Sequence, residues 1–187
     1  MIAAARAVLD AGGEVWFAAE TARRAFPPLR AGWSKRGQPA TVLSSGRNGR
    51  RTILGALNPA TGELVRTLRP RCRPADVLAA VEALGAVRPG TPKLLVWDNA
   101  PPHMPHRVRD AAREAGIAIA FLPFRSPELM PLEELWRGLK RTVAANRCYP
   151  SLDALAERTV AWLDGMSAQD RLRRCGLQTS KFDWLPT

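Results

Sequence analysis

The stretch Leu94-Leu95-Val96-Trp97-Asp98-Asn99 is a short apolar run that ends in an acidic residue. A near-continuous apolar run is typical of a strand that is buried on both faces, as in parallel sheets. We therefore predict a buried strand over Lys93–Trp97, with Asp98 at its carboxyl end. Ligands gather at the carboxyl ends of strands in open α/β sheets, so Asp98 is a candidate site residue. The alternative role for Asp98 is to cap a helix that begins at Pro101.

A second informative stretch, Leu122–Trp136 (LPFRSPELMPLEELW), consists of a Pro-rich loop and the start of an amphipathic helix. Helical spacing predicts that one face of this helix is apolar. That face contains Leu132, Leu135, Trp136, Leu139 and Val143. Glu133 flanks the apolar face, whereas Glu134 is expected to point toward solvent. Glu133 is therefore the better candidate for a cleft at the rim of the sheet, the alternative being an acid that merely stabilises a helix N-terminus.

Asp98 and Glu133 have the chemistry of a shared metal site. Thirty-four residues lie between them. Mg²⁺ prefers oxygen ligands and binds through only a few protein carboxylates. Enzymes that cut phosphodiester backbones often use two such ions, about 4 Å apart, to stabilise the attacking and leaving oxygens. We therefore expect both acids to be catalytic, metal-binding residues.

The remaining pattern predicts an α/β fold. Further strands are expected at Val15–Ala19, Ala40–Ser44, Arg51–Leu57 and Ile117–Leu122, with a hairpin turn at residues 45–49 and an extension of the antiparallel part at Glu63–Leu68. Helices are expected at Pro74–Leu84, Pro101–Ala115, Pro131–Asn146 and Leu152–Leu163, followed by a basic tail. Strand–helix–strand units favour parallel pairing with right-handed crossovers. The order of elements therefore predicts a mixed five-stranded sheet with helices on both faces.

Length and composition favour one globular domain without a membrane span. The 187 residues, 46% of them apolar, suit a single sizeable core. No run of 18 or more apolar residues occurs, and Met1–Asp10 makes a poor signal peptide, so we expect a cytoplasmic protein. Cys72, Cys148 and Cys175 are odd in number and include no CxxC pair. They predict reduced thiols rather than a disulfide framework or a zinc site.

The net charge of +11 favours a polyanionic partner, most often nucleic acid. The chain has 24 Arg and only 4 Lys. A GC-rich genome would explain the preference for Arg over Lys, but not the excess of basic over acidic residues. A membrane-surface role is less favoured, because no predicted helix combines a basic face with a broad aromatic face.

Three groups of residues are candidates for DNA contact. They are Trp33, Lys35 and Arg36 in a loop, Arg47, Arg50 and Arg51 at or beside the predicted hairpin tip, and Arg137, Lys140 and Arg141 along the helix of Glu133. The tip could reach a groove, the loop Trp could stack on an unpaired base, and the helix cations could meet phosphates. The alternatives are a solvated turn and a Trp that packs locally.

Three motifs resemble bacterial insertion-sequence transposases of the mariner superfamily, which carry a DDE superfamily endonuclease domain. The motifs are VWFAAET…WSKRG (Val15–Gly37), WDNAPPH (Trp97–His103) and LPFRSPELMPLEELW (Leu122–Trp136). The 34-residue spacing of the acids also matches one branch of that superfamily. The resemblance implies a ribonuclease H-like fold, a D-D-E acid triad, a two-metal site for Mg²⁺ or Mn²⁺, and cleavage and rejoining of DNA at transposon ends.

The resemblance implies a counterpart for two of the family's three acids. Asp98 and Glu133 correspond to the second and third acids, and His103 to a recurrent His, whereas His106 has no counterpart. The first acid falls at Ala19, so the metal site is expected to be weakened. Glu20 cannot replace it without a bulge, because successive side chains of a strand face opposite ways. A further departure is Met130, where the family usually has Asn, and two departures favour natural decay or divergence over engineered inactivation.

The expected function is that of a transposase catalytic domain that is impaired by the loss of the first acid. The alternative is a non-catalytic nucleic-acid-binding module on the same fold, and a ribonuclease H-like nuclease outside transposition is a less favoured third reading. We expect a lead-in at residues 1–14, the catalytic domain at 15–165 and a basic tail at 166–187. Expected partners are double-stranded DNA at transposon ends, a helix-turn-helix reader as a separate chain or fusion, and a second copy of the chain. The expected location is the bacterial cytoplasm, at the nucleoid.

Overall fold

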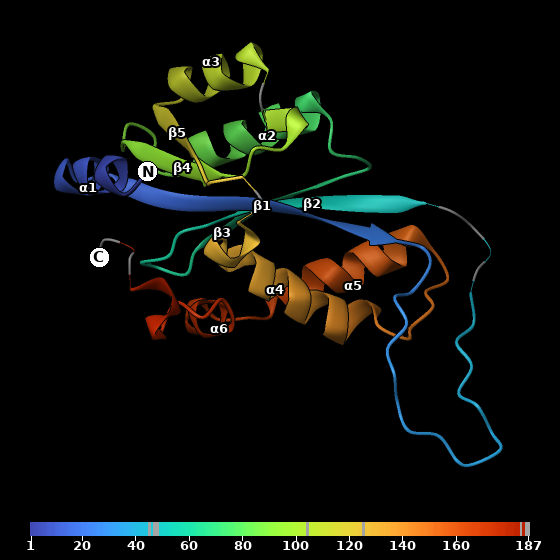
Figure 1. Cartoon of the computed structure of the whole chain (residues 1–187). Helices are drawn as coiled ribbons and strands as arrows, with labels where there is room; N and C mark the ends of the chain where they lie inside the picture. Colours follow the sequence, from blue (N-terminus) through green and yellow to red (C-terminus); the bar gives the residue numbers. More distant parts are fainter. Residues whose placement is uncertain (45, 47–48, 104, 125, 184, 186–187) are drawn as a thin grey trace.

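The strands of the chain form one five-stranded sheet in the order β3-β2-β1-β4-β5 (Figure 1). The computed structural model describes residues 1–44, 46, 49–103, 105–124, 126–183 and 185. The strands are β1 (Glu14–Arg24), β2 (Arg50–Leu57), β3 (Leu64–Arg69), β4 (Lys93–Trp97) and β5 (Ile117–Phe121). β1 pairs antiparallel with β2 and parallel with β4, and β4 pairs parallel with β5. The predicted mixed five-stranded sheet is therefore confirmed.

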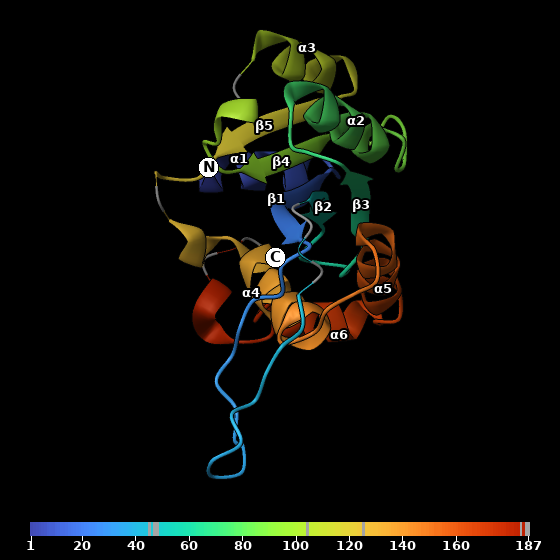
Figure 2. The same cartoon turned by 90° about the vertical axis from the view of Figure 1, so that its right-hand side faces the viewer.

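Helices cover both faces of this sheet. They are α1 (Ile2–Asp10), α2 (Pro74–Gly85), α3 (His106–Glu114), α4 (Pro131–Leu139), α5 (Leu152–Asp164) and α6 (Ala168–Arg174). Short 3-10 helices occupy Pro101–His103 (η1), Pro127–Leu129 (η2) and Ser180–Phe182 (η4), and a π-helical turn follows α4 at Lys140–Ala144 (η3). Figures 1 and 2 show α2 and α3 on one face and α4, α5 and α6 on the other.

The alternation of side chains along β1 separates two cores. Trp16 and Ala18 join the cluster beneath α2 and α3, whereas Phe17 and Ala19 join the cluster beneath α4 and α5. All four are buried, because β1 is the central strand and helices cover both of its faces. The chain termini share the second cluster, which includes Ala5 of α1 and Cys175 after α6.

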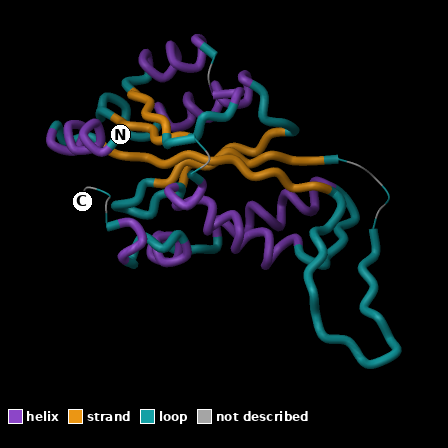
Figure 3. Tube along the Cα trace, in the orientation of Figure 1, coloured by secondary structure: helices purple, strands orange, loops and turns teal. Residues whose placement is uncertain are grey.

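The predicted strand at Ala40–Ser44 is wrong. These residues lie in a long loop that projects from the sheet between β1 and β2 (Figure 3). β1 continues to Arg24, whose partner is Arg50 at the start of β2, and the segment between them forms a loop that pairs with neither strand. Leu43 is consequently exposed. Of the predicted hairpin turn, residues 45, 47 and 48 lie outside the described residues.

Two predicted helices have different bounds in the structure. The segment from Pro101 forms only η1 before α3 begins at His106. The helix expected from Pro131 to Asn146 ends as an α-helix at Leu139 and continues as the π-helical turn. In the described part of the chain, the search for a helix that is both long and apolar enough to span a bilayer finds none.

Candidate active site

One cavity at the carboxyl edge of the parallel strands brings together the three positions singled out in the sequence. Ala19, Asp98 and Glu133 all line it, and its volume is about 280 Å³. The remaining lining residues come from the loops after β4 and β5 and from the start of α4: Asn99, Ala100, Leu122, Pro123, Phe124, Ser126, Pro127 and Met130. Asn99 joins the two strand ends, because its side-chain amide donates to the carbonyl of Leu122 at 2.6 Å.

Asp98 reaches the cavity because β4 ends one residue earlier, at Trp97. Its Oδ1 atom accepts a hydrogen bond from the backbone N–H of Ala100 at 3.1 Å and lies 2.8 Å from Nδ1 of His103. Burial alone would raise the pKa of Asp98, but the bonds from His103 and Ala100 outweigh it and lower that pKa. Asp98 thus caps the following turn and remains a half-exposed carboxylate, with a side-chain exposure of 54%.

Glu133 lies in the first turn of α4 and is half-buried. Burial raises its pKa, and the negative charges of Asp98 and Glu20 raise it further, while Lys140 and Arg137 act in the opposite direction. Asp98 and Glu133 line the same cavity, and the charge of Asp98 reaches Glu133 strongly enough to raise its pKa. Both are oxygen donors, which suits Mg²⁺ or Mn²⁺.

The neighbouring acid, Glu134, has a different role from the solvent-facing one expected. Its carboxylate accepts from Arg137 at 2.8 Å and from Lys181 of η4 at 2.8 Å. Glu134 therefore ties the C-terminal segment to α4, which the sequence pattern missed because Lys181 is distant in the chain.

Ala19 lines the cavity beside Asp98 and Glu133. The pairing of β1 with β2 continues without interruption from Phe17 to Arg24, so the strand has a regular alternation there. Ala19 consequently faces α4, in the same buried cluster as Leu132, whereas Glu20 is directed to the other face. This regular register keeps the side chain of Glu20 out of the cavity.

His103 is fully buried and links the two faces. Its ring stacks on Trp97, with centroids 4.0 Å apart. Its Nδ1 atom lies 2.8 Å from Asp98 Oδ1 and its Nε2 atom lies 3.3 Å from Glu20 Oε2. Burial alone would lower the pKa of His103, but the nearby side chains of Asp98, Cys72 and Glu20 raise it to about 11. His103 is therefore a cation that orients Asp98.

Comparison with known proteins identifies the architecture around these residues. Residues 14–156 match the family model described as DDE superfamily endonuclease. The chain belongs to this family. Protein y4pE/y4sA of Sinorhizobium fredii is 27% identical to this DDE-family chain over 110 residues, which are 58% of this chain and 79% of that protein.

Solved structures give the fold of this DDE-family chain independently. The Mos1 transposase paired-end complex with left transposon end superimposes with a TM-score of 0.69 at 18% identity, covering 98% of this chain and 58% of that one. The catalytic domain of Mos1 mariner transposase gives a TM-score of 0.63 at 14% identity, covering 97% and 87%. The predicted ribonuclease H-like fold is therefore confirmed. The chain spans 58% of the length of the Mos1 chain in that complex.

The basic candidates of this DDE-family chain are distributed unevenly around the cavity. Lys140 and Arg137 are close enough to Glu133 to influence its pKa, and Arg141 is exposed beside them. Arg137 also pairs with Glu134, and Arg51 pairs with Asp153 at 2.7 Å. Both therefore already have an acidic partner.

The loop candidates lie further out. Trp33, Lys35 and Arg36 are exposed on the long loop between β1 and β2, so Trp33 does not pack locally. Arg50 is exposed at the start of β2, and Arg47 lies outside the described residues. Cysteine spacing did not indicate a site at Cys72, but its side chain adjoins His103 and Glu20.

Proposed function

We propose that this chain is the catalytic domain of a transposase, in which Asp98 and Glu133 bind Mg²⁺ or Mn²⁺ for cleavage and transfer of DNA strands. The observation that carries the proposal is that both acids line one cavity together with Ala19, on the wall where a third acid would stand. When bound, the metal would supply charge stabilisation for the oxygens of a phosphodiester under attack. His103 would hold Asp98 in place, and Lys140 would face the phosphate backbone.

We further propose that Ala19 impairs this activity. The methyl group of Ala19 offers no oxygen to a metal ion, and Glu20 is directed away from the cavity. Two carboxylates can bind one ion, but a two-metal site needs ligands for both. The chain should therefore bind its second ion weakly and cleave DNA poorly.

DNA at transposon ends is the proposed substrate. The net charge of +11 supports a polyanionic partner. Among proteins of the same fold, Mos1 has been solved as a paired-end complex with transposon-end DNA and in paired-end complexes with Mn and Mg. The same proposal includes a helix-turn-helix reader, as a separate chain or a fusion, and pairing with a second copy of the chain. It divides the chain into a lead-in at residues 1–14, the catalytic domain at 15–165 and a basic tail at 166–187, and it places the protein at the nucleoid.

A non-catalytic nucleic-acid-binding module is the second candidate, and the observation that favours it is the missing acid at Ala19. Calorimetry with Mn²⁺ and nicking of supercoiled plasmid DNA separate the two. We expect weak Mn²⁺ binding and little nicking by the unmodified chain. Ala19→Asp should tighten Mn²⁺ binding by at least about tenfold and produce nicking.

The matched control is Ala19→Asn, which adds a side chain of similar size without its charge. The double variant Ala19→Asp/Glu133→Gln should lose the gained nicking. Robust nicking by the unmodified chain would overturn the proposed impairment. If neither the unmodified chain nor Ala19→Asp binds Mn²⁺ in the millimolar range, the non-catalytic module is the correct reading.

A further inference from the structure

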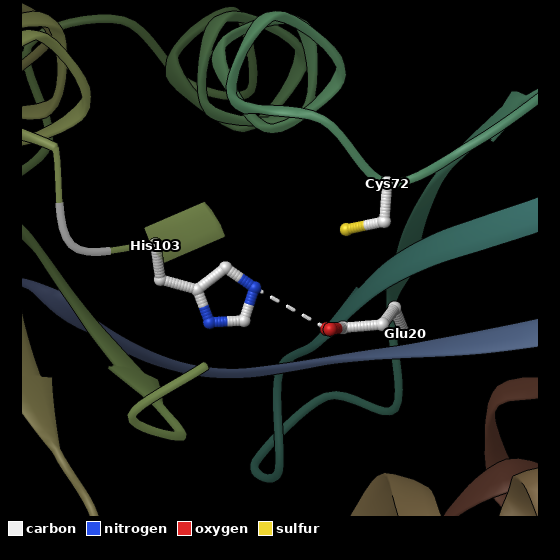
Figure 4. A group of neighbouring side chains, drawn as sticks. All are labelled: Glu20, Cys72 and His103. Carbon is white, nitrogen blue, oxygen red and sulfur yellow. Dashed lines mark ion pairs between the residues drawn. The ribbon is translucent and has the colours of Figure 1, made fainter. Parts of the chain in front are cut away.

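We propose that Glu20, Cys72 and His103 form a second metal site, which binds Zn²⁺ on the opposite face of β1 from the candidate active site. Each residue offers one ligand atom, and the three atoms all lie within 4.8 Å of one another (Figure 4). This inference does not rest on the proposed function, because neither Glu133 nor Ala19 contributes to the cluster.

The fold brings the three side chains together from separate elements. Glu20 belongs to β1, Cys72 lies in the connection between β3 and α2, and His103 ends η1. Figure 4 shows the Cys72 sulfur and the Glu20 carboxylate both directed toward the imidazole ring. Glu20 lies in the regular central strand and His103 is fully buried, so two of the three donors are held in place by packing.

The donor set selects the metal. One imidazole nitrogen, one sulfur and one carboxylate oxygen are typical zinc ligands, whereas a thiolate is a poor ligand for Mg²⁺. Zinc–ligand bonds of about 2.0–2.3 Å separate the ligand atoms of a tetrahedron by roughly 3.3–3.7 Å. Nε2 of His103 and Oε2 of Glu20 are already 3.3 Å apart. The Cys72 sulfur lies within 4.8 Å of both atoms, so a shift of up to about 1.5 Å completes that spacing.

The second ring nitrogen of His103 is arranged as in known metal sites. Ligand histidines usually donate their other N–H to a carboxylate or carbonyl, which fixes the ring and its tautomer. Here Nδ1 lies 2.8 Å from Asp98 Oδ1, and the stacking on Trp97 holds the ring plane. Nε2 is therefore the atom left to bind a metal, and it faces Glu20 and Cys72.

The buried polar atoms of the cluster lack ordinary hydrogen bonds. Nε2 of His103 and Oε2 of Glu20 are both buried, and neither forms a hydrogen bond of normal geometry with any described residue. In the metal-free chain a proton on Nε2 compensates the charge of Glu20. Zn²⁺ would take that place, with the Nε2 proton and the thiol proton of Cys72 released to solvent. The bound ion would fix the ring and, through Nδ1, the carboxylate of Asp98.

Metal titration of the chain tests the site. The protein is stripped with a chelator and titrated with Zn²⁺ against a chromophoric competitor, and in parallel with Co²⁺ as a spectroscopic probe. We expect one tightly bound Zn²⁺ per chain and a thiolate-to-Co²⁺ charge-transfer band. Cys72→Ser should abolish the band and weaken Zn²⁺ binding by at least about tenfold.

The controls separate this site from other thiols and from the candidate active site. Cys148→Ser removes an exposed thiol and should change neither result. Glu133→Gln should leave Zn²⁺ binding intact while abolishing any Mn²⁺-dependent nicking, so failure of the proposed function remains distinguishable. Glu20→Gln should keep the band but weaken Zn²⁺ binding, which gives a second test if Cys72→Ser does not fold.

Two outcomes would overturn the proposal. One is the absence of stoichiometric Zn²⁺ binding by the unmodified chain. The other is a charge-transfer band and Zn²⁺ affinity that persist unchanged in folded Cys72→Ser.

Discussion

Asp98 and His103 form a coupled pair in which a fully buried imidazole holds a half-exposed carboxylate, with Nδ1 and Oδ1 2.8 Å apart. Asp98 belongs to the cavity and His103 to the core around Trp97. The ring also faces Glu20 at 3.3 Å on its other side. His103, which packs in the core on one face of the sheet, therefore positions Asp98, which lines the cavity on the opposite face.

Replacement of this histidine should destabilise the protein. His103→Ala leaves a cavity beside Trp97 and removes the cation that faces Glu20. Because buried ion pairs are costly to break but Glu20 retains some solvent contact, we expect a loss of about 1–3 kcal/mol in the free energy of unfolding. Urea denaturation measures it. His106→Ala is the matched control, and since His106 is exposed it should cost less than about 0.5 kcal/mol. Equal effects of the two substitutions would contradict the role given to His103.

Gly55 of β2 should tolerate no side chain. It pairs with Ala19 across the strands, and a Cβ atom there would lie 2.9 Å from Cη2 and Cζ2 of the buried Trp136 ring. Gly55→Ala should therefore shift Trp136 and α4 and cost about 1–3 kcal/mol of stability. Thermal unfolding followed by Trp fluorescence measures this. Gly32→Ala places its Cβ in open space and should leave the transition unchanged. An unshifted transition for Gly55→Ala would show that the ring moves without cost.

The attachment of the C-terminal segment should weaken in acid. The bond from Lys181, together with Arg137, lowers the pKa of Glu134 below its ordinary 4.5 despite partial burial. A lowered folded-state pKa gives stability that is complete above the unfolded-state pKa and is lost as the pH falls through the folded-state value.

Comparison with Glu134→Gln isolates that contribution. The variant should melt at a lower temperature than the unmodified chain at neutral pH, and the difference should vanish as the pH falls below about 4.5. The effect should be small, because the ion pair is partly exposed. Glu157→Gln, on the exposed face of α5, serves as the control. A difference that is constant from neutral to acidic pH would rule out this ion pair as its cause.

DNA binding should depend on the basic end of α4. Lys140 and Arg141 are exposed there, so the double variant Lys140→Ala/Arg141→Ala should reduce the slope of log affinity against log salt by about 2. Fluorescence anisotropy with a labelled duplex at several salt concentrations measures the slope. Arg6→Ala in α1 removes an exposed arginine outside the candidate groups and should change it little. An unchanged slope in the double variant would place the contacts elsewhere.

The sequence predicted best the strands that are formed by near-continuous apolar runs. Lys93–Trp97 is a parallel strand that is buried at every position, as expected, because it lies inside the sheet and helices cover both faces. Ile117–Phe121 is a parallel strand too, but it lies at the edge of the sheet and only Ile117 is buried. The strand expected at Ala40–Ser44 failed for a complementary reason. Local β propensity does not specify a partner, and this segment lies in the long loop between β1 and β2, where it pairs with no described strand.

The sequence by itself indicated the family, the mixed sheet with helices on both faces and the candidate acids Asp98 and Glu133, because strand ends and helix phase are local properties of the chain. It also placed a strand at Ala40–Ser44, where the structure has a loop. Only the tertiary structure decided which distant groups meet. It directed Glu20 away from the cavity, joined Glu134 to Lys181, and placed Cys72 beside His103, where cysteine spacing predicted no zinc site. The physical reason is that hydrogen bonds and metal sites depend on distances of a few ångströms between side chains, and packing sets those distances for residues far apart in the chain.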